Sequence, residues 1–180
     1  VFHLAGVKGN PRMTEEKPAS FLVPIVMVNT NVLEACRVNQ VKVVVYTSSK
    51  AVLSGSYPGY AKMLGEKQVE AYRKQYGLDN FQIVRLYNVF GEGDNFDPAS
   101  GMVIPSLMGK IMRGDNPVEV WGNGSDIRSF SYSGDVAKTI LERFVSDDYS
   151  IEGREFSIGM LVRHLRGIIN FNYTFTEPES

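Results

Sequence analysis

The sequence has few of the residues that build disulfide frameworks or closed metal sites. It contains one cysteine, Cys36, and two histidines. A single thiol cannot form an internal disulfide, and the few Cys and His side chains do not suffice for a closed zinc site, so we expect no metal and a reducing compartment, the cytoplasm. Cys36 lies in the helix-like segment NVLEACR, where we interpret it as a buried structural thiol rather than a nucleophile.

Charge of one sign and long apolar runs are also scarce. The chain has 19 Lys and Arg against 20 Asp and Glu, a formal net charge of -1, and so lacks the basic footprint of proteins that bind nucleic acid or anionic membranes. The longest apolar run, FLVPIVMV at residues 21–28, contains Pro24 and is too short to span a bilayer. The first residues carry no basic leader, so we expect no signal peptide.

What the sequence does contain is an alternation of strand-like and helix-like segments. Strands are expected at residues 1–6, 41–49 and 81–91, and helices at 31–40 and 60–76. The β-branched run VKVVVYTSS is typical of a strand that is buried on both faces of a parallel sheet. The 180 residues suffice for one sizeable core, and the alternation predicts an α/β fold with a doubly wound parallel sheet.

The helix expected over residues 60–76 has Gly77 as its stop and a predicted buried stripe. That stripe consists of Met63, Leu64, Val69 and Tyr72. After Gly91 the sequence indicates a loop, a helix over residues 104–112, a strand and turn at 118–124, and a helix that starts at Ser133. In the tail from Ile151, only the segment LVRHLRGII suggests an element.

Polar residues follow two of the expected strands, where an open α/β sheet collects its ligands. Thr47, Ser48 and Ser49 come after the apolar run VVVY at the end of one strand, and Asn88 and Gly91 lie at the end of the next. A hydroxyl at a strand end can form a proton relay with a Tyr and a Lys from the next helix. The ammonium lowers the pKa of the phenol, and the hydroxyl binds the same sugar oxygen as the phenol does.

Taken together, six segments resemble the extended short-chain dehydrogenase/reductase family, in its branch of NAD-dependent nucleotide-sugar epimerases and dehydratases. They are VFHLAG, NVLEACR with VKVVVYTSSKAV, YAKMLGEKQVEAYRKQYGL, IVRLYNVFGEGDNFDP, MVIPSLMGKIMRG and VWGNGSDIRSFSYSGDVAKTI. Their shared order is far more specific than any one of them. The resemblance implies a Rossmann-like fold, NAD or NADP as cofactor, a nucleotide-diphosphate sugar as substrate, and a homodimer.

The resemblance also implies a division of the chain. Residues 1–91 would form a partial Rossmann-like dinucleotide-binding domain whose N-terminal part is missing from this sequence. Residues 92–180 would be mainly a small C-terminal substrate-binding portion, with residues 118–145 as a candidate for returning to the Rossmann-like core.

Matched residue by residue, the family's catalytic hydroxyl falls on Ser49 and its catalytic lysine on Lys62. The family tyrosine precedes that lysine by four residues, where this chain has Pro58, flanked by Tyr57 and Tyr60. We predict Tyr60 as the catalytic phenol. Our preferred interpretation is a partial sequence in which residues before Val1 and around 53–62 are absent, and the alternative is an inactive or rearranged site.

Cofactor and substrate contacts follow from the same matching. The sequence has no glycine-rich phosphate-binding turn on a first strand and helix, and GEGDNF at residues 91–96 follows a late strand and is a weak match. In a partial sequence, the residues that resemble the turn beside the dinucleotide are His3, Leu4, Ala5 and Gly6, together with Lys62.

The substrate side of the resemblance involves Asn88, Val103 of the segment MVIPSL, and Arg128. Asn88 would contact the sugar nucleotide, and Arg128 would pair with the diphosphate, since a guanidinium fork suits phosphate oxygens. The alternative for Arg128 is a solvated surface side chain. Trp121 is open to two readings, stacking on a base or packing in a core.

Within the family branch, GDP-fucose synthase and sugar 4-epimerases are the nearest in pattern. Ala51 and Met102 stand where a double epimerase has Cys and His, and neither can exchange a proton. Lys50 and Ala51 replace the Asp-Glu pair of a 4,6-dehydratase. We therefore expect a sugar 4-epimerase or 4-keto reductase, and keep an inactive nucleotide-sugar binding or scaffold protein as the alternative.

Overall fold

The chain forms two compact units in a computed structural model that describes residues 1–145 and 147–176. Unit 1 comprises Val1–Tyr87 and Gly134–Ile151, and unit 2 comprises Asn88–Ser133 and the residues from Glu152 onward. The first boundary between the units lies at residues 87/88, slightly before the division expected at 91/92. Of the segment 118–145, the part from Gly134 belongs to unit 1 and the part before it to unit 2.

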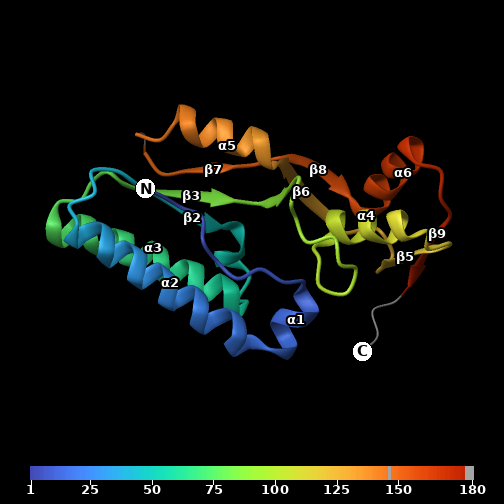
Figure 1. Cartoon of the computed structure of the whole chain (residues 1–180), viewed down its shortest axis with the longest axis horizontal. Coiled ribbons are helices and arrows are strands. Elements are labelled where there is room, and N and C mark those ends of the chain that lie inside the picture. The colour runs from blue at the N-terminus through green and yellow to red at the C-terminus, as the bar shows by residue number, and fades with distance from the viewer. Residues whose placement is uncertain (146, 177–180) are drawn as a thin grey trace. The chain divides into compact units, whose positions relative to one another are not determined.

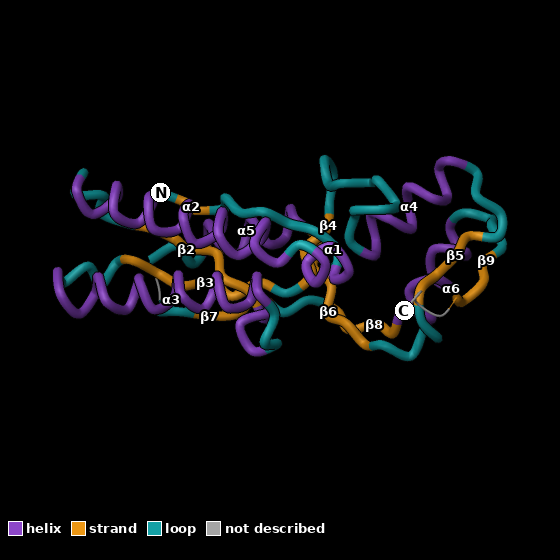
Figure 2. The backbone as a smooth tube through the Cα atoms, turned by 90° about the horizontal axis from the view of Figure 1, so that it is seen from below, coloured by secondary structure: helices purple, strands orange, loops and turns teal. Residues whose placement is uncertain are grey.

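Unit 1 is built on a four-stranded parallel sheet with the strand order β1-β2-β3-β7. The strands are β1 (Phe2–His3), β2 (Val44–Ser49), β3 (Phe81–Leu86) and β7 (Tyr149–Ile151). Helices α2 (Pro18–Val38) and α3 (Tyr57–Tyr76) lie side by side along one face of this sheet, and α5 (Ser133–Glu142) lies along the other (Figure 1). Seen from below, β2, β3 and β7 run alongside one another (Figure 2). The predicted doubly wound α/β sheet is confirmed.

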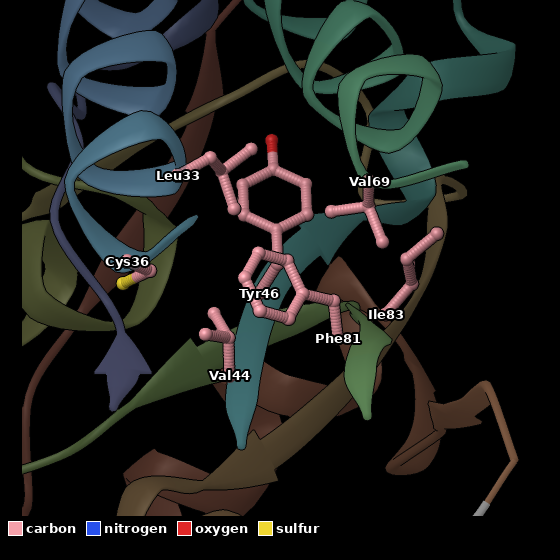
Figure 3. Packing of buried hydrophobic residues seen from close by; sticks show 7 residues of the cluster. All are labelled: Leu33, Cys36, Val44, Tyr46, Val69, Phe81 and Ile83. Carbon is pink, nitrogen blue, oxygen red and sulfur yellow. The ribbon is translucent and has the colours of Figure 1, made fainter. Parts of the chain in front are cut away.

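The core of unit 1 fills the space between β2, β3 and the helix pair α2 and α3. Its buried side chains are Leu33, Cys36, Val44, Tyr46, Val69, Phe81 and Ile83. The ring of Tyr46 rises from β2 between Leu33 on α2 and Val69 on α3 (Figure 3). Fully burying a large apolar side chain contributes about 1.5–3 kcal/mol, so this cluster is the main tie between helices and sheet. Cys36 is buried there, as predicted.

Helix α2 is much longer than the sequence indicated, because the apolar run at 21–28 belongs to it and Pro24 lies inside it. Its buried side chains follow a helical stripe: Phe21, Ile25, Asn29, Leu33 and Cys36. Among the described residues, α2 is the one helix long and apolar enough to cross a membrane by length and composition. In this fold the stripe packs against α3 and the sheet, as in the core helix of an α/β protein.

Helix α3 begins at Tyr57, three residues earlier than expected. The Ser56 hydroxyl accepts a hydrogen bond from the Gly59 amide at 3.2 Å, and Gly77, with φ 66°, ends the helix as predicted. The predicted buried stripe was wrong for Met63 and Leu64, which are 39% and 45% exposed. The buried residues are Gly59, Ala61, Gly65, Glu66 and Val69, because small side chains let α3 approach its neighbours closely.

Two short helical segments complete unit 1. They are α1 (Pro11–Glu16) and the 3-10 helix η1 (Lys50–Leu53), which directly follows β2. The Asn10 side chain caps α1 by accepting a hydrogen bond from the Met13 amide at 2.9 Å.

The described residues of unit 2 form two small sheets and two helices. One sheet has the order β4-β6-β8, with β4 (Asn88–Phe90), β6 (Ile127–Tyr132) and β8 (Arg154–Ser157). The other pairs β5 (Val118–Trp121) in parallel with β9 (Tyr173–Thr176). Helices α4 (Val103–Arg113) and α6 (Ile158–Ile168) pack with both sheets around a core that includes Leu107, Val118, Phe130, Leu161 and Val162. The tail that the sequence left unassigned thus supplies β8, α6 and β9.

Candidate active site

Lys62 lies in the second turn of α3, at the edge of unit 1 where the parallel strands β1 and β2 end. Its Nζ donates a hydrogen bond to the Thr47 carbonyl at 2.7 Å and lies 5.2 Å from the centroid of the Tyr46 ring. Burial lowers the pKa of the Lys62 amine to about 8, since the charged form is poorly solvated there. The structure therefore holds a perturbed, ionisable amine at the carboxyl ends of the strands.

Ser49 is the last residue of β2 and is only partly buried. Its Oγ accepts a hydrogen bond from the Ala51 amide at 3.1 Å and so caps η1. The neighbouring Ser48 points into the fold, where its hydroxyl donates to Glu66 Oε1 at 2.5 Å. Arg85 binds both oxygens of that carboxylate, at 2.8 and 2.7 Å. This buried contact fixes the strand end that carries Ser49.

The two candidate tyrosines lie in the first turn of α3. Tyr57 and Tyr60 are each 48% exposed, and their rings meet edge to face at a centroid distance of 6.4 Å. Residues two apart on a helix do not share a face, so Tyr60 and Lys62 point to different sides of α3. The position on the Lys62 face, four residues earlier, holds Pro58. Here the structure does not bring the predicted Tyr60 and Lys62 together.

Tyr46 is the phenol that does contact Lys62. It is fully buried, and burial raises the pKa of its hydroxyl well above the usual range. Such a phenol remains protonated and is unsuited to exchanging protons with a ligand. Tyr46 therefore supports the site, a role that could not be predicted from the sequence because the residue lies inside a strand.

The residues predicted to lie beside a dinucleotide divide into two kinds. His3 is buried, and burial lowers the pKa of its imidazole. Leu4, Ala5 and Gly6 follow β1 as exposed backbone. A Cβ added at Gly6 would lie 3.8 Å from Lys62 Nζ, its nearest contact. These exposed residues lie beside the amine, at the position where the sequence predicts the dinucleotide.

The predicted substrate-binding residues all lie in unit 2. Asn88 and Arg128 stand on the paired strands β4 and β6. The Asn88 amide donates to the Ser129 carbonyl at 2.9 Å, and Arg128 lies 3.6 Å from the Asp126 carboxylate with about a third of its side chain exposed. Val103 begins α4 and packs against the unit 2 core.

A cleft of about 560 Å³ lies in unit 2, and part of its lining is the turn that precedes Arg128 in the sequence. It is lined by Trp121, Gly122, Asn123, Gly124, Ser125, Asp126, Ile158 and Phe175. Trp121 is 46% exposed and therefore faces this cleft rather than the core, and the Lys110 ammonium lies 5.8 Å from its ring centroid. Of these lining residues, only Trp121 was proposed from the sequence as a ligand contact. The Gly and Asn residues of GNGSD are typical of a turn, and they were the sequence signal for the neighbouring part of the lining.

Within the described residues, no group of three or more His, Cys, Asp or Glu side chains could hold a metal ion.

A parallel sheet with helices on both faces, and hydroxyl and amine side chains at its carboxyl edge, defines a Rossmann-like α/β protein of the nucleotide-binding class. The family model described as the NAD dependent epimerase/dehydratase family matches residues 1–159. The chain belongs to this family, which confirms the resemblance seen in its sequence.

Individual relatives agree with the family. The chain is 32% identical over 169 residues to a dTDP-4-dehydro-6-deoxy-D-allose reductase of Streptomyces sp, covering 83% of this chain and 51% of the relative. It is 28% identical to a probable GDP-L-fucose synthase 1 of Oryza sativa subsp. japonica, covering 86% of this chain and 56% of the relative. The chain thus spans about half the length of these curated relatives.

Solved structures show the same fold. A UDP-N-acetylglucosamine 4-epimerase from Methanobrevibacter ruminantium M1, solved in complex with UDP-N-acetylmuramic acid, superposes with a TM-score of 0.88 at 22% identity. The match covers 99% of this chain and 64% of that one.

Proposed function

We propose that the protein acts as an NAD(P)-dependent nucleotide-sugar enzyme that reduces or epimerises the sugar at C4. The observation that carries this proposal is Lys62, a half-buried amine with a lowered pKa at the carboxyl ends of β1 and β2, in a chain of the epimerase/dehydratase family. Perturbed amines at strand ends are candidates for acid-base chemistry.

In this proposal the chain's own residues bind and polarise the reacting oxygen. Ser49 donates a hydrogen bond to the sugar oxygen, and the Lys62 ammonium stabilises negative charge that develops beside it. We assign Tyr60 as the proton donor; because it lies on a different side of α3 from Lys62 in this structure, the Lys62 ammonium would act on the reacting oxygen and not through the phenol. The backbone of Leu4, Ala5 and Gly6 would hold NAD or NADP together with Lys62, and the bound cofactor would carry the hydride.

Substrate binding is assigned to unit 2. The Arg128 guanidinium would pair with the diphosphate, Asn88 would contact the sugar nucleotide, and Val103 would stand at the start of the helix that closes over it. The cleft beside Trp121 offers an aromatic ring for the base. Together these groups suit a nucleotide-diphosphate sugar.

Reduction of a 4-keto sugar is favoured over double epimerisation because Ala51 and Met102 cannot exchange protons. The Streptomyces relative, by its name, is a reductase of a 4-dehydro sugar, which supports the same choice. The proposal includes a cytoplasmic homodimer that acts without nucleic acid or a membrane.

The test uses the polypeptide as its gene encodes it, with NADPH deuterated at the transferred position and a dTDP-4-dehydro-6-deoxy sugar. We expect deuterium at C4 of the product, detected by mass spectrometry. Lys62→Met should reduce the rate by about 10²-fold or more, the usual contribution of an acid-base group. Lys67→Met is the matched control, because Lys67 is exposed and pairs with Glu70 on the same helix.

The competing function is a binding or scaffold protein of the same fold without catalysis. It predicts that the nucleotide sugar binds, measured by calorimetry, with neither deuterium transfer nor inversion at C4 in any variant, whereas a 4-epimerase would invert C4 without taking up deuterium. Comparing Tyr60→Phe with Tyr57→Phe completes the design. Loss of transfer in Tyr57→Phe alone would contradict the assignment of Tyr60.

A further inference from the structure

Helix α2 carries one polar side chain, Asn29, within its buried stripe. Asn29 is fully buried among Phe21, Ile25, Leu33 and Cys36. Burying an amide without partners costs roughly 1–3 kcal/mol in proteins, so its hydrogen bonds show what it does. Both ends of the amide are used. His3 Nε2 donates to Asn29 Oδ1 at 2.9 Å, and Asn29 Nδ2 donates to the Tyr46 hydroxyl at 3.0 Å.

The chain of hydrogen bonds continues to Lys62. The Tyr46 hydroxyl donates to the Lys62 carbonyl at 3.2 Å, while Lys62 Nζ donates to the Thr47 carbonyl at 2.7 Å. The Thr47 hydroxyl then donates to the His3 carbonyl at 2.9 Å. These contacts form a closed ring through β1, α2, β2 and α3, which we name the Asn29 ring; its members are His3, Asn29, Tyr46, Thr47 and Lys62.

The Asn29 ring contacts Lys62 both at its backbone carbonyl and at its side-chain ammonium. Its carbonyl accepts from the Tyr46 hydroxyl, and its ammonium lies over the Tyr46 aromatic face, 5.2 Å from the centroid. The orientation of Tyr46 therefore affects the positions of both the carbonyl and the ammonium of Lys62. The Tyr46 hydroxyl in turn receives the Asn29 amide, so rotation of the phenol out of place would leave a buried donor without an acceptor.

We propose that Asn29 is a positioning residue for Lys62, acting through the hydroxyl of Tyr46. Asn29 does not touch a substrate, a cofactor or the amine itself. It fixes the Tyr46 phenol, and the phenol fixes the second turn of α3 and the aromatic face under the Lys62 ammonium. This inference rests on the proposed function for the role of Lys62, but its geometry involves only contacts within unit 1.

The test measures the Lys62 amine directly, without turnover. Competitive acetylation across a range of pH, with peptide mass spectrometry, reports the pKa of a single lysine amine. In Asn29→Leu and in Tyr46→Phe we expect the pKa of Lys62 to rise from about 8 toward the ordinary value of lysine. The reason is that a loosened ammonium reaches water. Asn31→Leu is the matched control, since Asn31 is exposed on the same helix.

The double variant Asn29→Leu with Tyr46→Phe identifies the route of the effect. If Asn29 acts through the hydroxyl, the double variant should shift the pKa of Lys62 no further than either single variant does. Additive shifts would overturn the proposed route. An unchanged Lys62 titration in both single variants, with lower thermal stability, would reduce Asn29 to a structural core residue and overturn the proposal.

Folding and function can be separated in this design. Tyr46→Phe retains the ring and its volume, so it serves if Asn29→Leu does not fold. A shifted Lys62 titration in a protein that never transfers hydride would support the positioning role and contradict the proposed function. Normal hydride transfer in the wild type, with an unshifted Lys62 titration in the variants, would support the proposed function and contradict the positioning role of Asn29.

Discussion

At the scale of the single residue, the chemistry of unit 1 centres on an amine that the fold keeps partly out of water. Lys62 has hydrogen-bond and aromatic partners, and burial lowers its pKa because the charged amine is poorly solvated there. The lysine was identified from the sequence because its flanking segment is distinctive. Its environment was not, since that depends on His3, Asn29 and Tyr46, which lie far from it in sequence.

The lowered pKa makes a prediction about stability. The Lys62 pKa is about 8 in the fold against an ordinary 10.5, so between these values the unfolded chain binds more protons. The free energy of unfolding gains a contribution that rises with pH across this window, whereas below about pH 8 the cost of burying the charge is present in full. Lys62→Met should lack this contribution.

The measurement is urea denaturation of wild type and Lys62→Met over this pH range. The wild-type stability relative to the variant should rise from about pH 8 to about pH 10.5. Parallel curves would show that the amine titrates normally. Lys67→Met, which alters an exposed amine, should give a curve parallel to wild type.

At the scale of the element, α3 depends on small residues where it meets β2 and α2. A Cβ added at Gly65 would lie 2.2 Å from the Tyr46 hydroxyl oxygen and 2.9 Å from Asn29 Nδ2. Both neighbours are buried and hydrogen-bonded, so neither can move away freely. The close approach of the helix to the strand therefore requires glycine at this position.

We predict that Gly65→Ala lowers the free energy of unfolding by about 1–3 kcal/mol, the usual cost of overpacking a core. Adding Tyr46→Phe should recover part of the loss, because it removes the oxygen that the methyl group meets. Gly167→Ala on α6 is the control, where an added Cβ meets no atom within 4 Å. Chemical denaturation measures all three, and equal effects at residues 65 and 167 would contradict the packing explanation.

Element by element, the sequence predicted what local signals specify. The run VVYTSS and the stop at Gly77 predicted β2 and the end of α3, since β-branched residues and a left-handed glycine have local preferences. The predicted stripe on α3 was confirmed at Val69 but wrong at Met63 and Leu64, which look like core residues, while the close contacts use Ala61 and Gly65. Their burial depends on the partner surface rather than on periodicity.

At the scale of the whole molecule, the exposed apolar side chains of α2 and α3 bear on the proposed homodimer. Val23 and Met27 on α2 are 49% and 58% exposed, and Leu64 on α3 is 45% exposed. An isologous pairing through these two helices would bury the same patch twice. This is the dimer that the family resemblance led us to expect.

We predict that Met27→Glu and Leu64→Glu each prevent the proposed homodimer from forming, because a charge buried in an apolar interface is strongly unfavourable. Sedimentation velocity gives the mass in solution. Met112→Glu on α4, where the side chain is 76% exposed, should leave the mass unchanged. A wild-type protein that sediments as a monomer would contradict the homodimer directly.

The order of segments along the sequence predicted the family, and the family model confirms that prediction over residues 1–159. The candidate site was only partly predictable. Lys62 and Ser49 could be located by matching, whereas the relation of Tyr57 and Tyr60 to Lys62 depends on where α3 begins. That start is set by the Ser56 cap, which was not predicted from the sequence.

The Asn29 ring places three distant positions under a joint evolutionary constraint. A side chain at position 65 would meet the hydroxyl oxygen and Cζ of Tyr46, and a change at position 46 that removes the hydroxyl would leave the amide at position 29 without its acceptor. Substitutions at 29, 46 and 65 should therefore occur together among related chains, as residues in contact tend to covary. A lineage that replaces Gly65 would be expected to carry an apolar residue in place of Asn29 as well.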